Sequence, residues 1–153
     1  MLHYAYMATP VGMLTIAEED GFITNIAFGQ RTFDGILGEN ALICKAKAQL
    51  EEYFAGTRKD FDLPLDMKGT DFQKRVWSAL TAVPYGRTAS YKDIARMVDS
   101  PKGFRAVGMA NNRNPIVIVV PCHRIVGANG SMTGYAGGIE AKEFLLELEK
   151  KNI

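Results

Sequence analysis

The chain has 153 residues, of which 47% are hydrophobic and 23% charged, a composition that fits a globular protein and excludes intrinsic disorder. No stretch reaches the length of a membrane span, and the N-terminus lacks the basic segment and apolar run of a signal peptide. Cys44 and Cys122 are too far apart in the sequence to suggest a disulfide framework or a zinc site. We therefore expect a cytoplasmic protein with no metal, no cofactor and no membrane partner.

The formal net charge of +1 hides an uneven distribution of charge along the chain. Residues 1–69 carry 6 Lys/Arg and 10 Asp/Glu, whereas residues 70–153 carry 12 Lys/Arg and 7 Asp/Glu. Basic charge gathered in one half is what a polyanion-binding surface requires, although an uneven solvated surface would give the same numbers.

Residues 1–56 have the pattern of a small α/β domain with an antiparallel sheet. Strand-like segments at 13–17 and 22–28 flank Asp20-Gly21, a dipeptide typical of a hairpin turn, and an earlier strand around 2–7 would complete the sheet. Apolar side chains at helical spacing then predict a helix that ends before Gly56: Leu42, Ile43, Ala46, Leu50, Tyr53 and Phe54. Cys44 lies just off this stripe and is interpreted as structural.

Residues 57–69 are polar and contain Pro64 and Gly69, so we expect them to link the first domain to a second, residues 70–153. The second domain begins with Thr70 and Gln73 at the spacing of a capping box. This spacing predicts a helix to about residue 82, with an apolar face of Phe72, Val76 and Leu80. A turn at residues 84–86 follows it.

The next segment is typical of a helix-turn-helix. Ser90 can cap a short helix, and Ser100 with Pro101 has the residue types that begin a second helix, at about residues 102–112. The second helix contains Ala106, Gly108 and Ala110, which leave little side-chain bulk on part of its surface. Either a neighbouring helix or a nucleic-acid backbone could approach such a surface, and Arg105 in its middle favours the nucleic acid.

The segment Pro121-Cys122-His123-Arg124 brings a thiol, an imidazole and a guanidinium together after the apolar run 116–120. A neighbouring imidazole can lower the pKa of a thiol from about 8.5 towards neutrality and so favour a reactive thiolate. A buried cysteine is otherwise often an inert core residue. The residues around the segment therefore decide between the two interpretations.

Four motifs occur in a fixed order: Arg105-Ala106-Val107-Gly108, Asn114-Pro115, Pro121-Cys122-His123-Arg124-Ile125-Val126 and Gly134-Tyr135-Ala136-Gly137-Gly138. Together they resemble the O6-alkylguanine-DNA alkyltransferases, direct-reversal repair proteins also called methylated-DNA–protein-cysteine methyltransferases. The resemblance is close over residues 70–150. It is looser in the N-terminal third, where it follows the short bacterial and archaeal forms. The most specific signal is the Pro-Cys-His-Arg segment with Asn-Pro shortly before it.

The resemblance implies that Cys122 accepts the alkyl group from O6 of a damaged guanine and becomes a permanent thioether. Such a displacement needs a base near the thiol, and His123 is the natural candidate. Neighbouring side chains in an extended segment point to opposite faces, so contact between the two requires a bend or a bridging water. By resemblance, Asn114 joins the second helix of the helix-turn-helix to the segment that carries Cys122.

The resemblance also implies that Glu149, in the last helix, orients His123. Helical spacing places Glu149 away from the other glutamates of that helix, on a flank that it shares with Lys142. The same spacing predicts an apolar face of Ala141, Phe144, Leu145 and Leu148. A simple exposed edge remains an alternative for Glu149.

The DNA-binding roles come from the resemblance as well. Arg105 would fill the stack position vacated by a flipped nucleotide, Tyr91 would help to rotate that nucleotide, and the small-faced helix would enter the minor groove. The expected DNA contacts are Arg105, Lys92, Ser100, Ala106, Gly108 and Arg124. The expected base pocket is lined by Tyr91, Ile125, Tyr135, Ala136 and Gly137. Many relatives have serine where this chain has Ala136, so its backbone N–H would serve O6 instead.

We thus expect an α+β protein: a small N-terminal α/β domain and a mostly helical C-terminal domain with a winged helix-turn-helix. Its expected function is suicidal, single-turnover repair of O6-alkylguanine, and of O4-alkylthymine, in double-stranded DNA by a monomer. Two alternatives remain: a lesion-binding sensor of the alkyltransferase-like kind, and a thiol hydrolase using Cys122, His123 and Glu149. The presence of Cys122 argues against the sensor, and Arg105 with the helix-turn-helix argues against the hydrolase.

Overall fold

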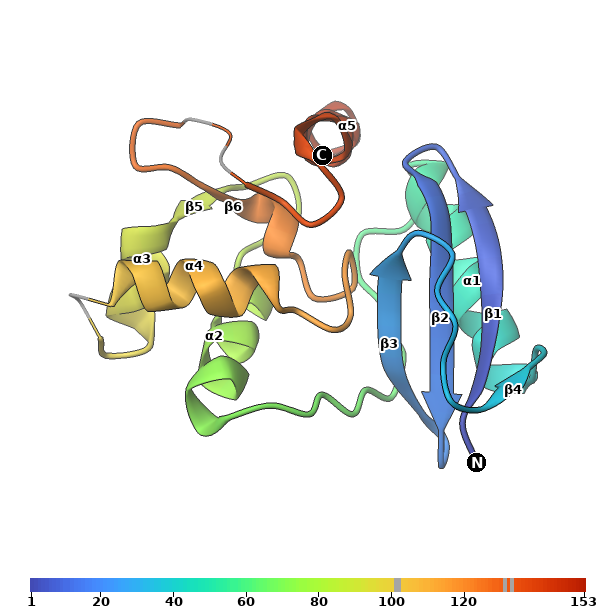
Figure 1. Ribbon diagram of the computed structural model, residues 1–153. Helices are drawn as coiled ribbons and strands as arrows, with labels where there is room; N and C mark the ends of the chain where they lie inside the picture. Colours follow the sequence, from blue (N-terminus) through green and yellow to red (C-terminus); the bar gives the residue numbers. More distant parts are fainter. Residues whose placement is uncertain (101–102, 131, 133) are drawn as a thin grey trace. The chain divides into compact units, whose positions relative to one another are not determined.

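The computed structural model describes residues 1–100, 103–130, 132 and 134–153 (Figure 1). The chain forms two compact units. Unit 1 contains residues Met1–Lys68 and Pro115–Val119, and unit 2 contains Gly69–Asn114 and Val120–Ile153. The short segment 115–119 therefore belongs with the N-terminal residues, which the sequence did not indicate.

Unit 1 is a four-stranded sheet in the order β3-β2-β1-β4 with one helix packed on it (Figure 1). The strands are β1 His3–Thr9, β2 Gly12–Glu19, β3 Phe22–Phe28 and β4 Ile36–Leu37. The pairs β1–β2 and β2–β3 are antiparallel, as predicted, whereas β4 pairs parallel with β1. Asp20 and Gly21 adopt positive φ angles of 55° and 85°, which two-residue hairpin turns of this kind require.

Helix α1, Ala41–Phe54, covers the sheet with a stripe of fully buried side chains from Ile43, Ala46, Leu50 and Tyr53, while Leu42 and Phe54 of the predicted stripe are half-buried. Its N-cap is Asn40, whose side chain accepts a hydrogen bond from the Ile43 amide. Cys44 lies on the exposed side of α1, and its Sγ is 3.3 Å from a carboxylate oxygen of Glu39. Its exposure agrees with a place just off the apolar stripe.

Two segments outside the four strands form backbone hydrogen bonds with β3. Within the polar stretch 57–69, the Ile23 amide donates to the Pro64 carbonyl and the Asp66 amide donates to the Ile23 carbonyl. At segment 115–119, the Ile26 amide donates to the Pro115 carbonyl at 2.9 Å, and the Val117 amide donates back to Ile26 at 3.0 Å. The chain thus leaves unit 2 after Asn114, pairs briefly with β3 and re-enters unit 2 at residue 120.

Unit 2 consists of helices around a very short parallel two-stranded sheet. Its elements are α2 Asp71–Thr81, β5 Ala89–Ser90, α3 Tyr91–Met97, α4 Phe104–Asn112, the 3-10 turn η1 Cys122–Arg124, β6 Ile125–Val126 and α5 Ile139–Lys151. The capping boxes at Thr70 and Ser90 are both formed. Trp77 fastens α2 to α4, because its Nε1–H donates to the Ala110 carbonyl at 2.9 Å.

Helix α4 begins later than expected. Its first residue is Phe104 and its N-cap is Gly103, without a side-chain capping bond. Ser100 instead lies in the preceding turn, where its carbonyl accepts a hydrogen bond from Gly103 N–H at 2.8 Å. The expected roles of Pro101 and Lys102 at the start of this helix fall outside the described residues.

Candidate active site in the helical unit

Cys122 is the first residue of η1, and its side chain is 2% exposed. Two asparagines at the end of α4 hold the backbone around it. Asn114 Nδ2 donates to the Val120 carbonyl at 2.8 Å, as expected for a residue that joins α4 to this segment. Asn111, which the sequence analysis missed, donates to the Cys122 carbonyl at 3.3 Å and is 1% exposed.

Burial dominates the electrostatics of the thiol. It raises the pKa of Cys122, while hydrogen bonds with Asn114 and Tyr135 and the positive charge of Lys142 act in the opposite direction. The resting group is therefore a protonated thiol that needs a base before it can act as a nucleophile.

His123 and Glu149 form a buried pair. His123 Nε2 lies 2.6 Å from Glu149 Oε2, and both side chains are 0% exposed. Burial lowers the pKa of His123, so the ring is neutral, and the carboxylate fixes its proton on Nε2. The lone pair is then on Nδ1, a buried atom without a hydrogen-bond partner among the described residues. The ring can accept a proton at that atom.

The residues Cys122–Arg124 form a 3-10 turn, which is the bend that the sequence analysis named as one way to bring Cys122 and His123 together. Two expectations about α5 need correction. The exposed-edge alternative for Glu149 is wrong, because the buried face of α5 consists of Ala141, Lys142, Leu145 and Glu149. Phe144, expected on that face, is 40% exposed. Two ionic side chains have displaced apolar ones because both find partners in η1 and β6.

Glu149 accepts four hydrogen bonds. Besides His123, Arg124 donates from Nε to Oε1 at 2.9 Å and from Nη2 to Oε2 at 3.1 Å. The Gly86 amide, in the turn after α2, donates to Oε1 at 3.1 Å. A carboxylate with all its acceptor positions occupied by N–H groups is held in one orientation and in its ionised form.

Arg124 does not lie where the DNA-binding prediction put it. Its side chain is 8% exposed, its Nη1 donates to the Val83 carbonyl at 2.8 Å, and its guanidinium lies 5.7 Å from the centre of the Tyr85 ring. These contacts engage all three guanidinium nitrogens within unit 2. The placement contradicts a phosphate contact and makes Arg124 a partner of Glu149.

Lys142 is a further residue that the sequence analysis did not assign. It is 0% exposed, its Nζ donates to the Ile125 carbonyl, and it lies 5.9 Å from the centre of the Tyr135 ring. Burial lowers its pKa, and the nearby Cys122 thiolate would raise it again. In the sequence, the shared flank of Lys142 and Glu149 in the last helix was the feature that could have indicated a role for Lys142.

Some of the residues expected to form the base pocket lie close to the thiol. Tyr135 is 9% exposed and lies close enough to lower the pKa of the Cys122 thiol, and Ile125 is fully buried in β6. Ala136 is exposed and Gly137 half-buried in the turn that leads into α5. Tyr91 begins α3, and its ring lies 3.7 Å from where a Cβ on Gly108 would be.

The expected DNA-contacting residues gather on α3 and α4 and the turn between them. Arg105 and Ala106 are exposed on α4, Gly108 is half-buried, and Lys92 is exposed on α3. Ser100 is half-buried in the turn before α4. Ala110, assigned to the small-residue surface, is instead buried at 3% exposure against α2.

Comparison with known proteins assigns both parts of the chain. Residues 2–67 match the family described as 6-O-methylguanine DNA methyltransferase, ribonuclease-like domain, and residues 71–151 match the DNA binding domain of the same name. The chain belongs to the 6-O-methylguanine DNA methyltransferases. The family resemblance read from the motifs is thereby confirmed.

Relatives of this methyltransferase family match over nearly full length. The methylated-DNA–protein-cysteine methyltransferase of Mycobacterium leprae is 46% identical over 100% of this chain and 95% of its own length. The constitutive enzyme of Bacillus subtilis is 48% identical over 98% and 96%. The crystal structure of the Mycobacterium tuberculosis O6-methylguanine methyltransferase matches with a TM-score of 0.92 at 46% identity, covering 100% of this chain and 95% of that one. The expected α+β fold is confirmed.

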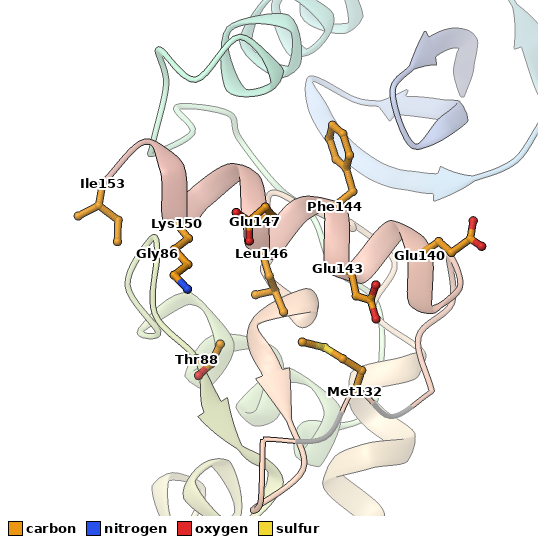
Figure 2. Close-up of a pocket in the computed structure, with 10 residues that line it drawn as sticks. All are labelled: Gly86, Thr88, Met132, Glu140, Glu143, Phe144, Leu146, Glu147, Lys150 and Ile153. Atoms are coloured by element: carbon orange, nitrogen blue, oxygen red, sulfur yellow. The ribbon is translucent and has the colours of Figure 1, made fainter.

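A groove of about 860 Å³ runs along α5 of this methyltransferase, separate from the thiol. Phe144, Leu146 and Met132 are among the residues that line it, and Figure 2 shows Leu146 and Met132 directed into it. Among the described residues that line the groove, Cys122 is not found, and Gly86 also belongs to the hydrogen-bonded cluster at Glu149. Across the described ranges, no cluster of His, Cys, Asp and Glu could hold a metal ion, and no helix could cross a membrane.

Proposed function

We propose that this chain repairs O6-alkylguanine in double-stranded DNA by transferring the alkyl group irreversibly to Cys122. The observation that carries the proposal is the buried thiol next to a neutral histidine whose other nitrogen is tied to a buried carboxylate. The relatives bear the name methylated-DNA–protein-cysteine methyltransferase. The relative from M. tuberculosis, 47% identical, has also been solved in complex with DNA.

The transfer follows from the chemistry of these groups. Nδ1 of His123 takes the thiol proton, through a bridging water where the two atoms do not meet, and Glu149 stabilises the imidazolium. The sulfur attacks the alkyl carbon as the bond from that carbon to O6 breaks, and the electron pair remains on the guanine. The guanine then takes the proton from His123, so that the proton and alkyl group have exchanged places. A thioether has no acidic proton to restore the thiolate, so each molecule acts once.

Access to O6 requires the nucleotide to leave the duplex, at a cost of a few kcal/mol. In the proposed complex α4 enters the minor groove, Arg105 fills the vacated stack and Tyr91 helps to rotate the nucleotide. Lys92, Ser100, Ala106 and Gly108 contact the backbone nearby. The exposure of Arg105 and Ala106 on one helix supports this arrangement.

The base would lie against Tyr135, with Ile125 behind it. The turn at Ala136 and Gly137 supplies backbone N–H groups for O6 and space for the alkyl group. O4-alkylthymine carries its alkyl group on an equivalent exocyclic oxygen. The protein is proposed to act as a cytoplasmic monomer, without cofactor. The chain has two cysteines, Cys44 and Cys122, far apart in the sequence, and this usage fits a reducing compartment.

The test is the intact mass of the protein after incubation with duplex DNA that contains one O6-methylguanine. We expect one added methyl group per molecule, on the peptide that carries Cys122, and saturation at one equivalent. Preferential binding of the lesion without a change of mass would favour a sensor. Absence of both would leave a thiol hydrolase as the function to pursue.

A further inference from the structure

Three side chains form a line along the exposed face of α4. Arg105, Met109 and Arg113 follow at intervals of four residues, so they lie one above the other on a helix, with Arg113 at its C-cap. All three are exposed, and Met109 is exposed by 62%. The opposite side of α4, formed by Val107, Ala110 and Asn111, is buried.

The line has an unusual chemical character for a solvated helix face. A single exposed methionine is common on protein surfaces and needs no explanation by itself. Here, however, it lies between two arginines that form no ion pair among the described residues, on a helix whose sequence has no acidic residue. Two more basic side chains, Lys92 and Arg96, are exposed on α3, where Arg96 is paired with Asp93 at 3.2 Å. The positive charges of Arg105 and Arg113, on either side of Met109, have no carboxylate partner among the described residues and are available to a polyanion.

The residues beside the line allow a close approach. Ala106 and Gly108 flank Met109 and add little bulk, so the methionine is the largest apolar side chain in the middle of this face. The minor groove is only about 6 Å wide. Proteins that bind it often insert apolar side chains, methionine included, between base steps, and the unbranched thioether adapts easily to such a site.

We propose that Met109 is an apolar wedge that contacts the minor groove of DNA, between Arg105 in the vacated stack position and a phosphate contact of Arg113. This inference rests on the proposed function. Four residues of helix advance by about 6 Å, and successive base pairs are about 3.4 Å apart. Met109 therefore contacts sugars and base edges up to two base pairs from the nucleotide whose place Arg105 fills.

The test compares four variants of the full chain for affinity to an undamaged duplex, measured by fluorescence anisotropy over a range of salt concentrations. Met109→Ala and Met109→Gln are expected to weaken binding about tenfold, while the apolar Met109→Leu retains it. The slope of log affinity against log salt stays unchanged in the three Met109 variants, because none of them loses a charge. Arg113→Gln, in contrast, is expected to lower that slope by about one.

Met97→Ala is the matched control, because Met97 is an exposed methionine (51%) at the end of α3, beside Arg75 and Ser78 of α2. We expect it to bind duplex like the unmodified chain. The rate at which iodoacetamide alkylates Cys122 should be the same in every variant, which shows that the site is intact. Binding by Met109→Ala within twofold of the unmodified chain would overturn the wedge, as would an equal loss in Met97→Ala.

Single-turnover transfer from duplex with one O6-methylguanine separates this inference from the proposed function. If Met109 variants bind duplex weakly and the unmodified chain transfers no methyl group, the repair function fails and the wedge stands. If transfer proceeds and Met109→Ala matches the unmodified chain in affinity, the wedge alone fails. A chain that does not bind duplex at all overturns both.

Discussion

Nε2 of His123 and Oε2 of Glu149 are 2.6 Å apart, and neither side chain is exposed. Twenty-five residues separate them, and the contact exists because η1 packs against one flank of α5. The pair fixes the tautomer of His123 and leaves Nδ1 as the acceptor. This single contact links the fold of the helical unit to the proposed proton transfer.

Replacing Glu149 with Gln should slow methyl transfer by at least about 100-fold, because the imidazolium loses its counter-charge and the tautomer its anchor. Single-turnover kinetics with lesion-containing duplex measures the effect, and affinity for undamaged duplex should not change. Glu147→Gln is the matched control, since Glu147 is exposed on the same helix. Equal rates for Glu149→Gln and Glu147→Gln would remove Glu149 from the mechanism.

Replacing Arg124 with Gln should lower the free energy of unfolding by about 3–5 kcal/mol, because it leaves the buried Glu149 carboxylate without its cation. The positive charge of Arg124 also lowers the pKa of His123, so this variant should shift the pH profile of transfer to higher pH. Urea denaturation and pH-dependent single-turnover rates measure the two effects. The slope of log DNA affinity against log salt concentration should be unaffected. A smaller slope would indicate that Arg124 contacts a phosphate after all.

Stability should fall as the pH drops below about 6.5, the usual pKa of histidine. Burial lowers the pKa of His123 in the folded chain, so below 6.5 the unfolded chain binds a proton that the folded chain does not. The stability is present at neutral pH and is lost on acidification through this range. Thermal melts from pH 8 to pH 5 measure it. His3, half-exposed, gives the control variant His3→Gln, which should keep the acid-side loss.

Replacing Lys142 with Met should raise the pKa of the Cys122 thiol, because the ammonium group favours the thiolate. The rate of iodoacetamide alkylation should then begin to rise at a higher pH than in the unmodified chain. Both proteins carry Cys44→Ser so that one thiol is observed. Lys150→Met, at an exposed position of α5, is the control. Identical pH profiles for Lys142→Met and its parent would show that Lys142 acts through packing alone.

Replacing Gly86 with Ala should destabilise helical unit 2 by more than about 1 kcal/mol. Gly86 has a φ of 78°, and an added Cβ would lie 2.6 Å from Cγ1 of Ile153. The two possible causes are strain in the backbone and the clash with the side chain of Ile153. The double variant with Ile153→Ala removes the clash and leaves the backbone strain. A remaining loss of stability in the double variant is due to the backbone; full recovery would assign the whole effect to the clash.

The sequence alone determined the elements whose signals are local. The hairpin at Asp20-Gly21, the stripe of α1, the capping box at Thr70 and the cap at Ser90 follow from turn chemistry, periodicity and short spacings, and the structure has them. The four motifs between residues 105 and 138, with the segment around Cys122 as the most specific, indicated the family. All these features are read from residue types and their order along the chain, so tertiary packing did not need to be known.

Tertiary structure decided where the ionic side chains lie. Arg124, Lys142 and Glu149 are charged residues, which usually lie on the surface. Helical periodicity places Lys142 and Glu149 on a flank of α5 that could be either buried or exposed. Their burial depends on partners 17 to 41 residues away, such as the Ile125 and Val83 carbonyls. The addition of residues 115–119 to β3 is also a long-range pairing. A charged side chain can be buried only where distant groups satisfy it, and periodicity contains no information about those groups.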